Sequence, residues 1–379
     1  MKIVLANLQR DYGGAEIHVR MLAQGLQQRG HEVSLLCHPD GTLYARAVQD
    51  GIRIIPLRVR NQLSPVAALR LAAQLRRERP DILHLHTPKD YLCGILAARL
   101  AKMPAVVLTR HMLLPLKPLM RAVYRQADAV VCLSQGMRAL LQAQGIAPEK
   151  LRLLYGAIDL NPFTPPYAAP GLEISEKSAG IMRLHTQCHV PAGALLIGCV
   201  GRLVQGKGQE ILIDAFAKVA ASEKSDQPGC RLILIGDGPE RSALETQAAR
   251  RGLADRVCFA GFLEDIPFVL SALDIVVVPS TTTELMPLAV MEAMAAGKAV
   301  IAANVGGVPE IISDASLGRL TPPGDTEALA AALNSLMEDA PLRWQLGTAA
   351  KAHVHVHFSF ARLLDDTEAL YSELMKNST

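Results

Sequence analysis

The chain of 379 residues has few aromatic side chains, one tryptophan and no long apolar segment free of charge. With aromatics at 4%, it offers few surfaces on which single-stranded bases stack, and it shows no recognisable nucleic-acid-binding motif. Its most apolar window, 91–109, carries Arg99 and Lys102, which disfavours a spanning helix. The first apolar run ends at Arg10 and is typical of a strand rather than a signal peptide. We therefore expect no nucleic-acid partner and no membrane-spanning segment.

Metal-binding motifs are also missing. The seven cysteines are scattered without a Cys-x-x-Cys pair, so the sequence shows no framework of zinc ligands. Because they lie in apolar runs, they predict reduced, buried thiols in a cytoplasmic protein. His353, His355 and His357 alternate, but the surrounding pattern is helical and predicts a surface position. The sequence thus predicts no metal site.

Charge is unevenly distributed along the chain, although its net value is only +3. Residues 1–160 hold 22 Lys and Arg against 11 Asp and Glu, whereas residues 161–379 hold 17 against 25. Within the basic half, residues 110–126 mix Leu and Met with Arg110, Lys117, Arg121 and Arg125. Such a stretch suits an anionic membrane surface or an anionic substrate, and it is equally compatible with a solvated helix face.

Short β-branched or leucine-rich runs alternate with amphipathic stretches in both halves. The predicted strands are 3–7, 32–37, 52–57, 82–86, 105–109, 129–134 and 152–154, then 195–200, 232–235, 257–260, 275–278 and 299–302. Helical periodicity fills most intervals, as at 15–29, which ends before Gly30. This alternation predicts two α/β domains with doubly wound parallel sheets, separated by a proline-rich segment near 161–171. Two such domains facing each other would enclose a ligand cleft.

Glycine-rich loops follow the first strand of each predicted domain. Gly13 and Gly14 would let the backbone approach a ligand closely before a helix N-terminus. In the second domain, Gly206-Lys207-Gly208 resembles a phosphate-binding P-loop, but Gly208 replaces the hydroxyl residue that holds Mg²⁺. An NTPase is therefore disfavoured, whereas Arg202 and Lys207 remain suitable for a diphosphate.

Two glutamates flank the start of a predicted helix after the strand 275–278. Glu284 lies just before the helix and Glu292 within it, with seven residues between them. Ionised carboxylates only accept hydrogen bonds, which matches the hydroxyl donors of sugars. Backbone N–H groups around Leu288 are placed to receive phosphate oxygens. A structural interpretation makes Glu284 a favourable charge at the helix N-terminus and Glu292 a solvated side chain.

Together, the Glu-x7-Glu element, the GRLxxxKG loop, the GDGP turn and the early glycine pair resemble retaining glycosyltransferases of family four. The resemblance implies the GT-B fold, with an acceptor-side domain at 1–165, a linker at 166–190, a nucleotide-sugar domain at 191–357 and a C-terminal helix at 358–379 that returns to the first domain. It implies a nucleotide-diphosphate-sugar as donor substrate, a glycan or lipid-linked acceptor, and neither cofactor nor metal. The basic excess of the first domain favours an anionic or lipid-borne acceptor and peripheral contact with the cytoplasmic face of the membrane. With the cysteine pattern, it predicts a cytoplasmic protein.

The resemblance also assigns roles. Arg202 and Lys207 would stabilise the departing diphosphate, Glu284 would bind the donor sugar, and Glu292 would bind the ribose. Gly13 and Gly14 would approach the donor, and His111 would face its sugar. The family's usual Gly-Phe after the first glutamate reads Leu285-Met286 here, which alters the donor pocket. Two alternatives remain open: a nucleotide-sugar epimerase of the same fold, and a sugar-nucleotide binder without catalytic activity.

Overall fold

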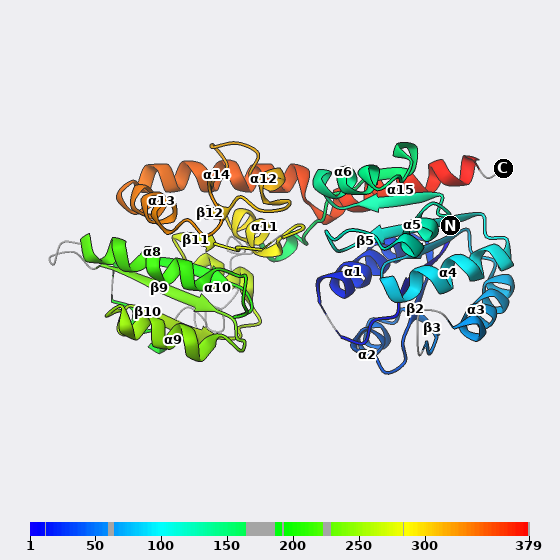
Figure 1. Cartoon of the computed structure of the whole chain (residues 1–379), viewed down its shortest axis with the longest axis horizontal. Helices are drawn as coiled ribbons and strands as arrows, with labels where there is room; N and C mark the ends of the chain where they lie inside the picture. The colour runs from blue at the N-terminus through cyan, green and yellow to red at the C-terminus, as the bar shows by residue number, and fades with distance from the viewer. Residues whose placement is uncertain are drawn as a thin grey trace, which may run out of the picture. The chain divides into compact units, whose positions relative to one another are not determined.

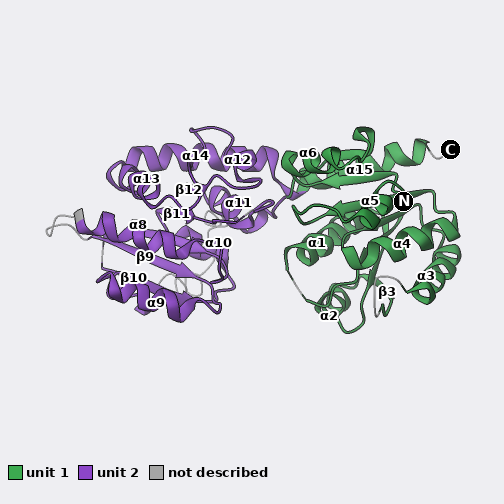
Figure 2. Ribbon diagram, in the orientation of Figure 1, with its two compact units in different colours: residues 1–156, 361–379 green, residues 157–360 purple. Residues whose placement is uncertain are grey.

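The computed structural model describes residues 1–11, 13–59, 64–163, 186–191, 193–222, 229–282 and 284–377. These residues form two α/β units, shown in Figure 1 and coloured separately in Figure 2. Unit 1 comprises Met1–Gly156 and Ala361–Thr379, and unit 2 comprises Ala157–Phe360. The N-terminal part of unit 1 therefore ends at Gly156, whereas the first domain was expected to extend to residue 165. Most of the predicted linker, 166–185, lies outside the described residues.

Unit 1 is built on a seven-stranded sheet in the order β3-β2-β1-β4-β5-β6-β7, with every neighbouring pair parallel. Its strands are β1 (Lys2–Asn7), β2 (Glu32–Cys37), β3 (Arg53–Pro56), β4 (Ile82–Leu85), β5 (Ala105–Arg110), β6 (Ala129–Cys132) and β7 (Leu151–Leu153). Its helices are α1 (Gly14–Gln28), α2 (Thr42–Gln49), α3 (Pro65–Glu78), α4 (Pro88–Ala101), α5 (Pro118–Tyr124), α6 (Gln135–Ala143) and the short η1 (Pro148–Lys150).

Unit 2 holds a six-stranded parallel sheet in the order β10-β9-β8-β11-β12-β13. Its strands are β8 (Leu195–Val200), β9 (Cys230–Ile235), β10 (Val257–Gly261), β11 (Ile275–Val278), β12 (Ala299–Ala303) and β13 (Arg319–Thr321). Its helices are η2 (Asn161–Phe163), α8 (Gln209–Ser222), α9 (Arg241–Arg250), α10 (Ile266–Ser271), α11 (Leu288–Ala295), α12 (Val308–Ile311), α13 (Thr326–Glu338) and α14 (Ala340–His357).

The predicted pair of doubly wound parallel sheets is confirmed. Central strands such as β5, β11 and β12 are buried along their whole length, because helices cover both faces of a parallel sheet. All predicted strands are present, with ends shifted by at most two residues. The structure adds β13, which was not predicted. β13 has the sequence Arg-Leu-Thr, with a single apolar residue, so it lacks the β-branched or leucine-rich run that marks the other strands.

The C-terminal helix α15 (Phe360–Asn377) belongs to unit 1, as the green ribbon in Figure 2 shows. Glu368 accepts from Arg29 at 2.5 Å and lies 2.6 Å from His31 Nε2, and Arg152 donates to Glu373 at 2.7 Å. In its buried face, the Tyr371 hydroxyl lies 2.6 Å from His84 Nδ1. These contacts attach the end of the chain to the unit that contains its beginning.

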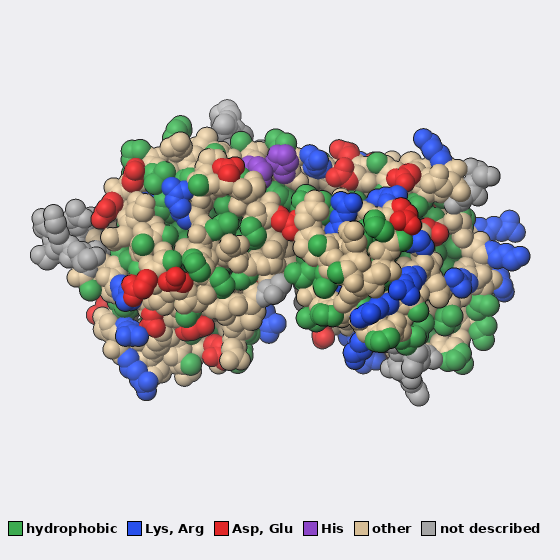
Figure 3. Space-filling model, turned by 45° about the horizontal axis from the view of Figure 1, so that its top comes forward, with side chains coloured by type: hydrophobic (Ala, Val, Ile, Leu, Met, Phe, Trp, Pro, Cys, Tyr) green, Lys and Arg blue, Asp and Glu red, His purple; other side chains and the backbone are tan. Residues whose placement is uncertain are grey.

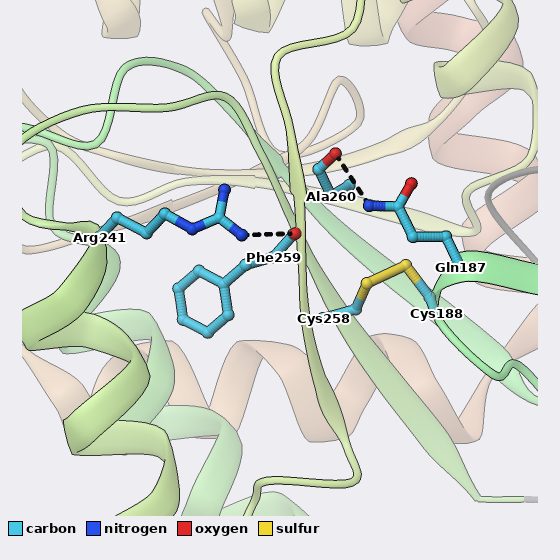
Figure 4. The surroundings of a disulfide bond; sticks show 6 residues. All are labelled: Gln187, Cys188, Arg241, Cys258, Phe259 and Ala260. Atoms are coloured by element: carbon cyan, nitrogen blue, oxygen red, sulfur yellow. Dashed lines mark hydrogen bonds between the residues drawn. A yellow bond between two sulfur atoms is a disulfide. The ribbon is translucent and has the colours of Figure 1, made fainter.

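Two of the seven cysteines contradict the prediction of free thiols. Cys188 and Cys258 form a disulfide between a segment near the start of unit 2 and β10, with their Cα atoms 5.3 Å apart (Figure 4). Their separation of 70 residues hid the pairing in the sequence. The other five cysteines are buried free thiols, as expected. The cysteine pattern therefore gives no argument for a reducing compartment.

Helix α14 carries the single tryptophan of the chain. A lone tryptophan is typical of an apolar anchor, but Trp344 is 74% exposed and does not pack in a core. His353, His355 and His357 lie on this helix, and the rings of His353 and His357 are in tilted contact with centroids 4.5 Å apart. Among the described helices, none combines the length and hydropathy needed to cross a membrane.

The contact between Tyr371 and His84 predicts a stability change. Replacing Tyr371 with Phe removes one hydrogen-bond partner from a fully buried imidazole, which should lower the free energy of unfolding by about 1–3 kcal/mol. The matched control is Tyr44→Phe on α2, since the Tyr44 hydroxyl makes no hydrogen bond within the described residues. Denaturant unfolding of both variants measures the difference, and equal losses would contradict the assignment.

Candidate functional site

The strand order of unit 2 reverses between β8 and β11, which lie side by side at the centre of the sheet. In a doubly wound sheet the loops leaving two such strands diverge, and ligands bind at their carboxyl ends. Here the loop after β8 is tied to the loop after β11. Gly206 O accepts hydrogen bonds from the backbone N–H groups of Thr281 and Thr282, at 2.9 and 3.3 Å. The two loops therefore form one surface.

Lys207 and Glu284 meet on this surface. The Lys207 ammonium donates to Glu284 Oε1 at 2.5 Å, and the buried Ser280 hydroxyl donates to the same oxygen at 2.8 Å. The Lys207 side chain is 36% exposed and the Glu284 side chain 16% exposed, so solvent reaches the ion pair. The structure thus brings together a cation and a carboxylate that lie 77 residues apart. Such a pair can receive an anion on the lysine and hydroxyl groups on the glutamate.

Arg202 stands at the exposed edge of the same loop. It follows β8 directly, and its backbone carbonyl accepts from Gln209 Nε2 at 3.1 Å, while its side chain is exposed. Gln209 is itself buried at the start of α8, so the backbone of Arg202 is held while the guanidinium extends into solvent. This placement suits the capture of a diffusing anion.

Glycines set the distance between these loops. Gly208 has a φ of +75°, and a Cβ there would lie 1.9 Å from Pro279 O. A Cβ on Gly306 or Gly307 would lie 1.7 Å from Glu284 O or 1.9 Å from Leu285 O, and the Gly307 N–H donates to Glu284 O at 2.8 Å. No side chain fits at these positions, so all three are steric requirements of the site. The role of the Gly306–Gly307 pair was not predicted, although its position in the loop after the buried strand β12 is a signal that could have indicated it.

Helix α11 places the second glutamate. Pro287 is the N-cap of this helix, which begins at Leu288. Leu288 and Glu292 are four residues apart and therefore lie on one face of the helix. Glu292 is half-buried, and desolvation raises the pKa of its carboxyl to about 7, so the side chain is not freely solvated.

In unit 1 the corresponding reversal lies between β1 and β4. Gly13 caps α1 in an extended conformation, and its N–H donates to Glu16 at 3.0 Å, while Asn7 at the end of β1 donates to the other Glu16 oxygen at 2.9 Å. A Cβ added to Gly14 would meet nothing within 4 Å, and its φ is not positive. Neither backbone strain nor packing within the described residues requires glycine at this position.

His111, the histidine singled out from the sequence, lies beside two others. It follows β5, His86 follows β4, and His18 lies on α1. His86 Nδ1 is 3.4 Å from His111 Nε2, and the three ring centroids are 5.2 to 5.8 Å apart. The backbone N–H of His86 donates to the buried Asp90 at 2.8 Å, which anchors the end of β4.

Burial determines the charge of these rings. It lowers the pKa of His18 to about 4 and holds the pKa values of His86 and His111 well below the usual range, with repulsion between the histidines as a second cause. All three imidazoles are therefore neutral near pH 7. Each neutral ring has one nitrogen lone pair available to a ligand.

The basic stretch 110–126 divides into a buried part and a surface part. Arg110 is buried and bonds to Tyr124 Oη at 3.2 Å and to Leu114 O, so it is not on the surface, contrary to the expectation for this stretch. Lys117 is exposed, and with it stand the exposed apolar residues Met112, Leu114 and Leu119. In the view of Figure 3, Lys and Arg side chains gather over unit 1.

The buried carboxyl of Glu292 predicts a pH-dependent stability. Its folded pKa of about 7 exceeds the value near 4.3 of an unfolded glutamate, so its contribution to stability is present below pH 4.3 and is lost as pH rises through 7. Glu292→Gln carries no charge at any pH. We expect this variant to raise Tm more at pH 8 than at pH 5. The control Glu264→Gln, on an exposed position of unit 2, should change Tm little at either pH.

Family models match both halves of the chain. The description "Glycosyltransferase Family 4" matches residues 12–162, and "Glycosyl transferases group 1" matches residues 185–353. A 2-deoxystreptamine N-acetyl-D-glucosaminyltransferase of Streptomyces fradiae is 31% identical over 86% of this chain and 83% of its own length. The lipopolysaccharide core biosynthesis glycosyltransferase LpsE of Rhizobium meliloti is 27% identical over 96% of both chains.

Solved structures agree with this assignment. Anabaena Alr3699/HepE in complex with UDP covers 98% of this chain and all of its own, with a TM-score of 0.83 and 26% identity. The matched folds are GT-B glycosyltransferases, as the two parallel sheets predict. With two family models that together span both units and a relative above 30% identity over most of its length, the chain belongs to glycosyltransferase family four.

Proposed function

We propose that the protein is a retaining, metal-independent glycosyltransferase that transfers a sugar from a uridine-diphosphate donor to a cell-envelope glycan or lipid-linked acceptor. The observation that carries the proposal is the Lys207–Glu284 pair at the strand-order reversal of unit 2. A cation next to a hydroxyl-accepting carboxylate matches the two parts of a sugar diphosphate. A nucleotide binder without activity would not require a cation at the bond that breaks.

In this proposal Lys207 and Arg202 stabilise the diphosphate leaving group. Negative charge grows on the diphosphate as its bond to the sugar breaks, and cations already in place stabilise that charge without reorganisation. Lys207 is held by Glu284, and Arg202 is exposed at the edge of the loop. When the donor binds, Lys207 pairs with a phosphate oxygen, and Glu284 accepts from a sugar hydroxyl.

Helix α11 is assigned to the nucleotide. The backbone N–H of Leu288 is in the first turn of this eight-residue helix, where phosphate oxygens bind favourably. Glu292, one turn further on the same face, accepts hydrogen bonds from the ribose hydroxyls. Those donors favour its ionised form and offset the burial that raises its pKa.

Unit 1 supplies the residues that the family resemblance assigns to the sugar and the acceptor. The open space above Gly14 and the exposed Gly13 give a ligand access to the backbone there. His111, held neutral by burial, is able to accept a hydrogen bond from a sugar hydroxyl. The accessible backbone and the neutral imidazole support the assignment of Gly13, Gly14 and His111 to the donor sugar.

Two observations on acidic residues support a metal-independent reaction that retains the anomeric configuration. It contains no Asp-x-Asp pair, the usual ligand of a donor-bound metal in the other large transferase fold. The carboxylate beside the predicted leaving group, Glu284, is already neutralised by Lys207, which suits a hydrogen-bond acceptor better than a nucleophile. In this proposal the departing phosphate accepts the acceptor's proton on the same face of the sugar.

The donor and its metal requirement are tested together. Thermal unfolding in EDTA with UDP, GDP, ADP and CDP should show a selective shift with UDP, the nucleotide bound in the similar HepE structure. A ligand at 100 times its Kd adds about 2.7 kcal/mol to the free energy of unfolding. Turnover in EDTA, with an α-linked sugar retained from an α-donor, would support the reaction. Activity that needs a divalent ion, or an inverted product, would refute it.

Two variants distinguish the proposed role of Lys207 in catalysis from that of Glu292 in nucleotide binding. Lys207→Ala should lower kcat by about 10²- to 10³-fold, because it removes a charge stabiliser of the transition state, and should weaken UDP binding less. Glu292→Ala should mainly weaken UDP binding. Lys218→Ala, which removes a lysine paired with Glu327 on the surface of the same unit, is the matched control and should leave both quantities unchanged. Wild-type kinetics in Lys207→Ala would show that the site is wrongly assigned.

The acceptor class is inferred from the surface of unit 1. Lys117 and the apolar residues Met112, Leu114 and Leu119 together fit an anionic bilayer surface, where lipid-borne acceptors reside. The name of the relative LpsE, which refers to the lipopolysaccharide core, supports an envelope acceptor. The name of the Streptomyces relative refers to 2-deoxystreptamine, so the acceptor requires a separate test.

Vesicle flotation tests the membrane surface. The protein should float with vesicles that contain phosphatidylglycerol at low salt, and less at high salt, because exposed charges are screened. It should not float with phosphatidylcholine alone. The triple change of Met112, Leu114 and Leu119 to Ser should abolish flotation. The matched control changes Val66 and Leu69, equally exposed on α3, to Ser and should retain it. Equal loss in both variants would count against this surface.

A further inference from the structure

The histidine cluster of unit 1 has the composition and spacing of a metal site. His18, His86 and His111 each offer a ligand nitrogen, and these nitrogens all lie within 4.8 Å of one another. The three residues come from α1 and from the ends of two neighbouring strands, so no spacing in the sequence connects them. Within the described parts of the chain, this is the one such group of three.

His86 lacks the hydrogen bonds that a buried imidazole usually makes. Its neighbour His84, two residues earlier, has Nδ1 2.6 Å from Tyr371 Oη and Nε2 2.6 Å from Thr109 Oγ1. His86 is equally buried, yet its Nε2 has no hydrogen-bond partner in the described structure. No hydrogen bond from the described residues therefore fixes this ring through Nε2, and Nδ1 is the nitrogen that faces His111.

The remaining contact of His86 fits two ligands of one ion better than a hydrogen bond. His86 Nδ1 lies 3.4 Å from His111 Nε2, beyond the range of about 2.7–3.2 Å for good N–H hydrogen bonds. Two nitrogens bound to one tetrahedral Zn²⁺ at about 2.0–2.1 Å are separated by about 3.3 Å. The half-buried His18 lies across from both, with its ring 5.8 Å from that of His86 and 5.2 Å from that of His111.

The geometry points to a three-histidine site for a divalent transition-metal ion, formed by His18, His86 and His111 in unit 1. Three imidazoles with no carboxylate ligand favour Zn²⁺, Co²⁺ or Ni²⁺ over Mg²⁺ and Ca²⁺, which prefer oxygen ligands. Three protein ligands leave the fourth tetrahedral position to solvent, so the ion exchanges with the medium.

Metal at this site has a consequence for transfer, and this step rests on the proposed function. The ion takes the nitrogen lone pair of His111, which then no longer accepts a hydrogen bond from a sugar hydroxyl. We therefore expect Zn²⁺ to inhibit the enzyme and EDTA to restore it. The ion is an inhibitor of a metal-independent reaction rather than part of it.

Calorimetric titration of the metal-free full-length protein with ZnCl₂ tests the site. The wild type should bind one ion with micromolar or tighter affinity, and excess Mg²⁺ should not compete. His18→Gln, at a half-buried position that tolerates substitution, should weaken binding by about a hundredfold, since even supporting residues of metal sites contribute 10- to 100-fold. His111→Gln, if folded, should do the same. Co²⁺ should give the intense visible bands of tetrahedral coordination in the wild type alone.

The matched control removes the other histidine pair. His353 and His357 stack on α14 and are the obvious competing site for a divalent metal. The double variant His353→Gln, His357→Gln should retain the tight site. Loss of Zn²⁺ binding in this control but not in His18→Gln would overturn the proposal, and so would the absence of binding to the wild type.

Transfer assays give a second, separable readout. Each variant is compared with itself, with and without Zn²⁺, so that its basal rate cancels. Inhibition should be strong in the wild type and in the α14 control and at least about tenfold weaker in His18→Gln. A protein that binds Zn²⁺ at the cluster but transfers no sugar from any donor would refute the proposed function alone. An active enzyme without the metal site would refute this inference alone.

Discussion

Parallel pairing of the strands fixes where the candidate sites of both units lie. In a parallel sheet every strand ends at the same edge, and a crossover helix must return the chain before the next strand begins. When the strand order reverses, adjacent strands send their following loops in opposite directions. The reversal between β8 and β11 thereby places Lys207 against Glu284, and the reversal between β1 and β4 gathers the histidines.

Close backbone contact then sets the shape of the unit 2 site. Gly208 lies against the end of β11, and Gly306 and Gly307 lie against the loop that carries Glu284. With side chains at these positions the loops would separate, and the ion pair would not form at its observed length. Precision in this site therefore comes from the absence of side chains as much as from the side chains that act.

Burial of titratable groups is the cost of this arrangement. Glu292 is held with a raised pKa, the imidazoles of His18, His86 and His111 are held neutral, and His86 Nε2 has no hydrogen-bond partner among the described residues. A fold selected only for stability would not keep these groups away from water and from partners. Their position at the carboxyl edges of both sheets is consistent with ligands that supply the missing interactions. The same desolvation makes the histidine cluster receptive to a metal ion.

The two-domain α/β architecture could be predicted from the sequence, because strand and helix periodicities depend on residues close together in the chain. The order of strand, loop and helix also made Lys207, Glu284 and Glu292 candidates, and the structure pairs the first two. Features that depend on contacts between distant segments could not be predicted. Cys188 meets Cys258, Arg110 turns inward, Trp344 remains exposed, and three histidines from separate elements converge. The local sequence pattern indicates whether a segment forms a helix or a strand. Which side chains are buried, and which residues they contact, depends on packing between segments that are distant in the sequence.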